Sequence, residues 1–137
     1  MSQNVDTSIS LKPLYILRTG ACPDDWTFVE DNCFSPARKT HEWKGRGDCG
    51  FNCIAVGKLC TDVGATLATK DETYAWLKAG GDSLGMVYGL TSTMKGNEHW
   101  FTEKLGHLGW SLIGPYPGCC EDTDNFFVCA RPVVPGQ

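Results

Sequence analysis

The sequence predicts an α+β fold in which the helices are grouped together instead of alternating with strands. Short β-prone runs come first, two helical segments follow, and further β-prone runs complete the chain. Eight cysteines in 137 residues predict a disulfide framework. We therefore expect two helices and several short strands, stabilised by disulfides.

The first predicted element is a β-hairpin within CPDDWTFVEDNCF, residues 22–34. Apolar runs at 26–29 and 33–34 are separated by the turn-forming residues EDN. An additional apolar run at 14–17 precedes this hairpin and is also β-prone.

The first helix is predicted to begin at Cys53. Within CIAVGKLC, the spacing of Cys53, Val56 and Cys60 places these residues on one helical face. Gly64 follows as a stop signal.

The second helix is predicted to follow Thr69. The Thr69 side chain can cap the first turn while Glu72 reaches back, which is the capping-box arrangement. Gly80 and Gly81 end the helical segment, because glycine adopts the left-handed conformation at low cost.

Four β-prone segments fill the remainder: MVYGL, EHWFT, WSLIG and NFFVCARP. The length indicates one domain, which we place at residues 14–132. Residues 1–13 are expected to be a flexible N-terminal segment, and residues 133–137 a C-terminal tail.

Composition argues against several classes of partner. The net charge is −4 and the twelve Lys and Arg residues are scattered, whereas a nucleic-acid phosphate backbone selects clustered basic residues. No apolar run approaches the ~20 residues of a membrane-spanning helix, so we expect no membrane insertion. The cysteines predict a secreted or extracellular location, with the export signal not present in this chain.

The cysteines also allow an alternative, because Cys49 and Cys53 with Cys119 and Cys120 are candidate zinc ligands. Structural zinc sites use closely spaced cysteine pairs, and only one such spacing occurs here. Adjacent cysteines seldom bind one ion comfortably. We therefore expect disulfides, with no metal and no cofactor.

Five stretches between residues 14 and 131 resemble, in the right order, parts of one known family: CPDDWTFVEDNCF, LCTDVGATLATKDE, VYGL, HWFT and FFVCAR. They are similar to the opening hairpin, the first helix with its Gly-Ala-x-Leu-Ala turn, the Trp-Ile-Gly-Leu strand, the next Trp-containing strand and the closing strand of the C-type lectin-like domain. The chain resembles a divergent member of this family with a shortened long loop. The resemblance implies a C-type lectin-like fold, with two helices plus two small antiparallel sheets.

The resemblance also implies disulfide pairings that sequence alone leaves open. Cys22 pairs with Cys33, and Cys60 on the first helix pairs with Cys129 on the last strand. The segment with Cys49 and Cys53 is then expected to be cross-linked to the segment with Cys119 and Cys120. Which of these four cysteines pairs with which stays open.

Sugar-binding members of this family use calcium, held by an acidic-Pro-Asn or Gln-Pro-Asp triplet and a Trp-Asn-Asp strand. This chain has neither motif, and SLIGPYPGCC stands where the triplet would fall. The acidic run EDTDN comes just before the last strand, where the family does not place its calcium. A solvated acidic turn is the simpler interpretation of that run. We therefore expect calcium-independent binding.

The candidate ligand-binding residues are polar or aromatic side chains on the loop face, roughly residues 103–125, together with one acidic residue before it. They are Glu98, Trp110, Tyr116, Glu121, Asp122, Asp124 and Asn125. Arg46, Gly47 and Asp48 form an RGD tripeptide, a weak adhesion motif beside glycines that also suit a helix entry.

We expect no enzymatic activity. No histidine that could act as a catalytic base follows the Cys119–Cys120 pair, and the histidines of the chain are isolated from nucleophile motifs. The sequence favours a secreted or cell-surface module that binds an extracellular protein or glycan. The alternative is a structural or adhesive scaffold of matrix, gamete, venom or ice-binding type, for which LTSTMKG is the only Thr-bearing candidate surface. The oligomeric state stays open.

Overall fold

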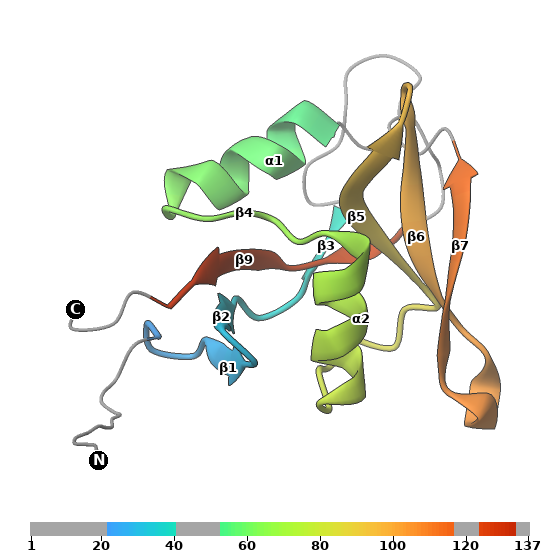
Figure 1. Cartoon of the computed structure of the whole chain (residues 1–137), viewed down its shortest axis with the longest axis horizontal. Coiled ribbons are helices and arrows are strands. Elements are labelled where there is room, and N and C mark those ends of the chain that lie inside the picture. Colours follow the sequence, from blue (N-terminus) through green and yellow to red (C-terminus); the bar gives the residue numbers. More distant parts are fainter. Residues whose placement is uncertain (1–21, 41–52, 117–123, 134–137) are drawn as a thin grey trace. The chain divides into compact units, whose positions relative to one another are not determined.

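The computed structural model describes residues 22–40, 53–116 and 124–133 (Figure 1). Within these ranges the chain is α+β, with two α-helices and two antiparallel-rich sheets, as predicted. The chain divides into two compact units, Met1–Ser35 with Arg131–Gln137, and Pro36–Ala130. We describe each unit by itself.

The first unit contains the predicted hairpin of β1 (Thr27–Val29) and β2 (Asn32–Phe34). The strands pair in antiparallel register, with Phe28 opposite Cys33. Cys22 and Cys33 form the predicted disulfide, which spans 11 residues. On a loop-entropy model this cross-link contributes about 3 kcal/mol to stability.

In the second unit, the first predicted helix is confirmed as α1 (Cys53–Asp62). Val56 and Cys60 lie on its buried face, as their spacing predicted. The helix ends two residues before Gly64. Neither described helix is long and apolar enough to cross a membrane.

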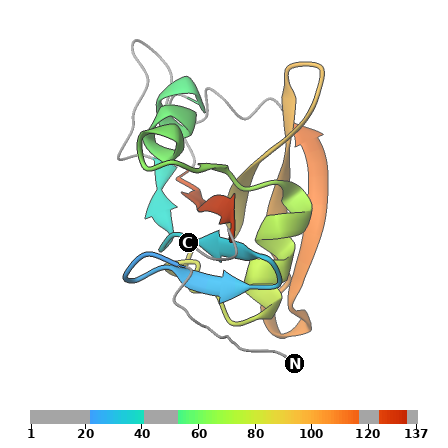
Figure 2. The same cartoon turned by 60° about the vertical axis from the view of Figure 1, so that its left-hand side comes forward.

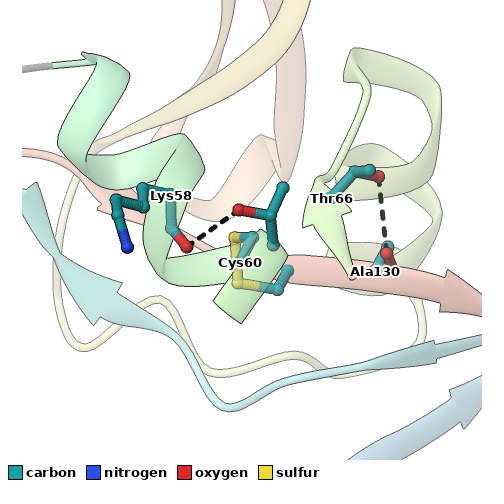
Figure 3. Close-up of a disulfide and its surroundings, with 6 residues drawn as sticks. Lys58, Cys60, Thr66 and Ala130 are labelled. Carbon is teal, nitrogen blue, oxygen red and sulfur yellow. Dashed lines mark hydrogen bonds between the residues drawn. A yellow bond between two sulfur atoms is a disulfide. The ribbon is translucent and has the colours of Figure 1, made fainter. Parts of the chain in front are cut away.

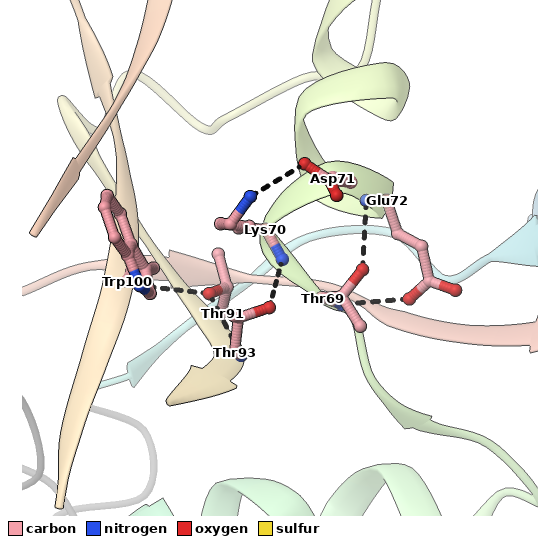
Figure 4. Close-up of polar contacts among 7 residues, drawn as sticks. All are labelled: Thr69, Lys70, Asp71, Glu72, Thr91, Thr93 and Trp100. Carbon is pink, nitrogen blue, oxygen red and sulfur yellow. Dashed lines mark hydrogen bonds and ion pairs between the residues drawn. The ribbon is translucent and has the colours of Figure 1, made fainter. Parts of the chain in front are cut away.

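The predicted capping box at the start of α2 (Lys70–Lys78) is also confirmed (Figure 4). The Glu72 backbone N–H donates to Thr69 Oγ1 at 3.1 Å, and the Thr69 N–H donates to Glu72 Oε1 at 2.9 Å. Gly80 has a φ of 101°, so the chain leaves the helix through a conformation that favours glycine. Trp76 lies on the buried face of α2.

The larger sheet of this unit has the strand order β3-β8-β5-β6-β7 (Figure 1 and Figure 2). All its neighbouring strands pair antiparallel except β5 and β8, which are parallel. The four segments predicted to be β-prone all contain strands. The five strands of the larger sheet are β3 (Arg38–Lys39), β5 (Tyr88–Lys95), β6 (Glu98–Lys104), β7 (Trp110–Tyr116) and β8 (Phe126–Phe127).

The sequence did not predict β3 or β4 (Thr66–Leu67), which are two residues long. β4 pairs with β9 (Cys129–Pro132), placing Leu67 opposite Cys129. Such short strands form because a partner strand is already in place, so no local sequence pattern marks them.

Phe126 lies at the centre of the core and is fully buried. Its ring centroid is 6.0 Å from that of Trp76 on α2 and 5.7 Å from that of Trp110 on β7. Gly89 lies opposite Phe126 in the parallel pair, and the missing side chain leaves room for the ring. This cluster joins α2 to the sheet.

The second predicted disulfide, Cys60–Cys129, joins α1 to β9 across 69 residues (Figure 3). Both cysteines are buried. The loop-entropy model gives about 4 kcal/mol for a loop of this length, more than for the hairpin disulfide. The helix and the strand before the C-terminus are therefore fixed to each other covalently.

Two glycine-to-alanine variants test the packing around Phe126. Gly89→Ala places a methyl group against the Phe126 ring and the Thr102 hydroxyl, so we expect a loss of about 1–3 kcal/mol of unfolding free energy. Gly57→Ala is the matched control, because nothing lies within 4 Å of an added methyl group and alanine favours the helix by about 1 kcal/mol. Urea denaturation measures both. Equal stability of Gly89→Ala and wild type would contradict the packing described here.

Candidate functional site

The structure separates the predicted ligand-binding residues of β6 and β7 between two ends of the sheet (Figure 1). Tyr116 lies opposite His99, near the β5–β6 turn. Trp110 lies opposite Lys104, at the β6–β7 turn. At about 3.3 Å per residue, Trp110 and Tyr116 are roughly 20 Å apart along the strand. They do not form one site.

Trp110 has a structural role at its end of the sheet. Its ring meets that of Phe126 edge to face, and Lys104 Nζ lies 5.5 Å from its ring centroid. The indole is half-buried. The indole therefore contacts the core through Phe126, and Lys104 lies over the indole ring.

Tyr116 is 52% exposed, at the end of β7 near the β5–β6 turn. Met94 of β5 lies opposite His99 of β6, which in turn lies opposite Tyr116 of β7. Directly opposed residues share one face of a sheet, so these side chains form one line across three strands. We call it the Met94–His99–Tyr116 row.

In this row, the buried side chain of His99 lies between the exposed side chains of Met94 and Tyr116. His99 is 5% exposed, whereas Met94 is 50% exposed. His99 Nδ1 lies 2.7 Å from the Thr91 carbonyl oxygen. Because a carbonyl oxygen only accepts, Nδ1 bears the proton and donates it to this bond. The ring is thereby fixed in orientation.

Sequence reasoning did not single out Met94 or His99 as site residues. A signal for them exists, because Gly96-Asn97 between two β-prone runs is a two-residue hairpin turn. Such a turn places Lys95 opposite Glu98 and Met94 opposite His99, which is the observed register.

Glu98 is exposed and lies opposite Lys95. Successive side chains of a strand alternate between its faces, so Glu98 projects away from the face that bears His99 and Tyr116. Glu98 is therefore close to the row in the chain but belongs to the other face of the sheet.

Asp124 and Asn125 connect the start of β8 to Thr40, which follows β3. The Thr40 hydroxyl donates to Asp124 Oδ1 at 3.3 Å and accepts from the Asn125 N–H at 3.0 Å. The Thr40 N–H donates to the Asn125 carbonyl oxygen at 2.7 Å. Asn125 is only 3% exposed, so this part of the acidic run has structural contacts.

The other predicted residues lie outside the described ranges. These are Glu121 and Asp122, the RGD tripeptide Arg46, Gly47 and Asp48, and the cysteines Cys49, Cys119 and Cys120. Cys53 is within the described residues and is disulfide-bonded. The predicted cross-link between these segments stays a prediction.

Several polar groups at the start of α2 have partners within the protein (Figure 4). The Lys70 N–H donates to Thr93 Oγ1 at 2.9 Å, and Lys70 Nζ forms an ion pair with Asp71 at 3.1 Å. Lys70 Nζ also lies 5.8 Å from the centroid of the half-buried Trp100 ring. Thr91, in the LTSTMKG segment, is fully buried and donates to the Trp100 carbonyl oxygen at 2.7 Å. This segment therefore does not present all its threonines to an ice surface.

No group of three or more His, Cys, Asp or Glu side chains that could hold a metal ion occurs among the residues described by the structure. Comparison with models of known protein families gives no match for this chain. No curated protein sequence matches it either.

Tyr88 on β5 lies beside a carboxylate of the opposite strand, which affects its pKa. The Tyr88 hydroxyl donates to Glu103 Oε2 at 3.2 Å, from the strand position directly opposite. This hydrogen bond, with the negative charge of Glu103, raises the pKa of Tyr88 above its ordinary value of 10.0. The neutral phenol is the form that the carboxylate stabilises.

Glu103→Gln is expected to lower the pKa of Tyr88 toward 10.0, because the amide bears no negative charge. In the wild type, the hydrogen bond between Tyr88 and Glu103 stabilises the fold at pH values below the unfolded-state pKa of the tyrosine, which is near 10. This stabilisation is lost as the pH rises through the raised pKa of Tyr88 in the folded protein. Alkaline titration of the tyrosine absorbance measures the change, with Tyr88→Phe identifying the signal. An unchanged Tyr88 titration in Glu103→Gln would show that Glu103 does not control it.

Proposed function

We propose that this protein is an extracellular binding module with a C-type lectin-like fold. It recognises a protein or glycan through the exposed end of the sheet beside the β5–β6 turn, without calcium. The observation that best supports the proposal is the Cys60–Cys129 disulfide between α1 and β9. The resemblance implied that Cys60 pairs with Cys129. The spacing of the cysteines alone allowed many other pairings.

The order of elements adds support for this assignment. A hairpin closed by Cys22–Cys33 is followed by β3, α1 and α2, and then by the strands β5 to β8 of the larger sheet. The Gly-Ala-x-Leu-Ala segment that resembles the family lies between the helices and includes β4. Disulfides in a chain of this size are typical of secreted domains.

Tyr116 is the residue best placed to contact a ligand. Its side chain is half exposed, and Tyr116 is the last residue of β7, which pairs with β6. Tyrosine is enriched among the residues that dominate binding energy. Its phenol combines a large apolar surface with a polar end, which suits both glycan and protein surfaces. Met94 adds exposed apolar surface on the same face.

Tyr116→Ala tests the recognition surface on arrays of glycans and of extracellular proteins. We expect at least a tenfold loss of affinity for the ligand found with the wild type, or about 1.4 kcal/mol, at unchanged melting temperature. Leu108→Ala is the matched control, because Leu108 is 74% exposed at the opposite end of the sheet. A loss with Leu108→Ala but not with Tyr116→Ala would place recognition elsewhere. If neither array yields a ligand, the scaffold alternative replaces the binding module.

Calcium is expected to leave both stability and binding unchanged. A ligand that binds only the native state raises the melting temperature, so a thermal-shift series with millimolar calcium and with chelator tests this directly. We expect no effect of calcium because the sequence lacks the calcium-binding triplet and the Trp-Asn-Asp strand of the family. A rise of several degrees with calcium would contradict the proposal and indicate a different ligand set.

A further inference from the structure

We propose that the Met94–His99 pair is a binding site for a soft monovalent metal ion of the copper(I) class. The ligands are the thioether sulfur of Met94 and Nε2 of His99, and Tyr116 lies beside them on the third strand. This inference does not depend on the binding module proposed above. It follows from strand register, the histidine hydrogen bond and the chemistry of the two donors.

Strand register brings the two donors together. Met94 and His99 are Cα partners in the antiparallel pair of β5 and β6, two positions from the Gly96-Asn97 turn. Opposed residues of an antiparallel pair have Cβ atoms about 4.5–5.5 Å apart and on the same face. The His99 imidazole and the Met94 thioether therefore belong to neighbouring positions on one face of the sheet. Both side chains are long enough to meet there.

The hydrogen bond of His99 prepares one ring nitrogen for metal binding. Nδ1–H donates to the Thr91 carbonyl oxygen at 2.7 Å, so in the neutral ring the lone pair is on Nε2. Metal-binding histidines almost always donate their other ring N–H to a carbonyl or carboxylate, which fixes the tautomer and the ring orientation. His99 has this partner already in the protein without metal.

Exposure of the row gives an ion a path from solvent. Met94 is 50% exposed and Tyr116 is 52% exposed, while His99 between them is 5% exposed. The largely buried ring limits the access of water to the bound ion.

The donor types select the ion. Thioether sulfur is a soft ligand that favours copper(I), and imidazole also binds copper, whereas calcium and magnesium prefer oxygen. Neither donor loses a proton on binding, and no electron is transferred, because the ion only exchanges solvent ligands for nitrogen and sulfur. The described cysteines are disulfide-bonded and do not offer competing thiols.

Silver(I) is the probe, because it is a soft monovalent ion without the redox reactions of copper. We expect native mass spectrometry and calorimetry to show one ion per wild-type chain. Met94→Leu should weaken binding at least tenfold, while Met86→Leu, the matched control on the preceding loop, leaves it unchanged. Met94 is half exposed, so the leucine variant is expected to fold.

His99→Asn separates metal binding from structure, because the asparagine amide can still donate to the Thr91 carbonyl but provides no Nε2. It should weaken silver binding at least tenfold, and His107→Asn, an exposed histidine of the β6–β7 connection, should not. If His99→Asn does not fold, silver-induced NMR shifts of the Met94 methyl and His99 ring signals in the wild type decide the question. Wild-type affinity in Met94→Leu, or no stoichiometric binding to the wild type, would overturn the proposal.

Discussion

The arrangement of the larger sheet depends on how the Phe126 ring is accommodated. β8 contributes only two residues, yet it pairs with β3 on one side and β5 on the other, so it joins distant parts of the chain. Phe126 fills the space between α2 and the sheet through its contacts with Trp76 and Trp110. This is possible because Gly89, directly opposite in β5, has no side chain. Phe126 and Trp76 are buried, and such large aromatic rings contribute much apolar area to the core of a small unit.

Covalent and non-covalent constraints complement each other in the same unit. The Cys60–Cys129 disulfide fixes α1 to β9, and the aromatic cluster fixes α2 to the sheet. β4 lies between the two helices in the chain and pairs with β9. Each helix is thereby held by a different kind of interaction. Residues near the β5–β6 turn take no part in this disulfide or in the aromatic cluster.

The two ends of the three long strands have different properties. At the β6–β7 end, Trp110 faces the core and is covered by Lys104. At the β5–β6 end, Met94 and Tyr116 are exposed on either side of His99. Irregular register occurs in both strand pairs near this end, between Leu90 and Met94 and between His99 and Phe101. Such irregularities are common beside functional sites because they redirect side chains. The proposed recognition surface and the proposed metal site both lie here.

The sequence by itself determined the elements whose signals are local. The capping box of Thr69 and Glu72, the helical face of Val56 and Cys60, and the Gly96-Asn97 turn act within a few residues, so their structures follow from their patterns. The two described disulfide pairs also followed, through the resemblance. The tertiary structure alone decided that Trp110 turns toward Phe126, that Asn125 is buried beside Thr40, and that Tyr116 is exposed. These outcomes depend on contacts between residues up to 85 positions apart in the sequence. A local sequence pattern does not contain the packing free energy of such distant contacts, so it cannot predict them.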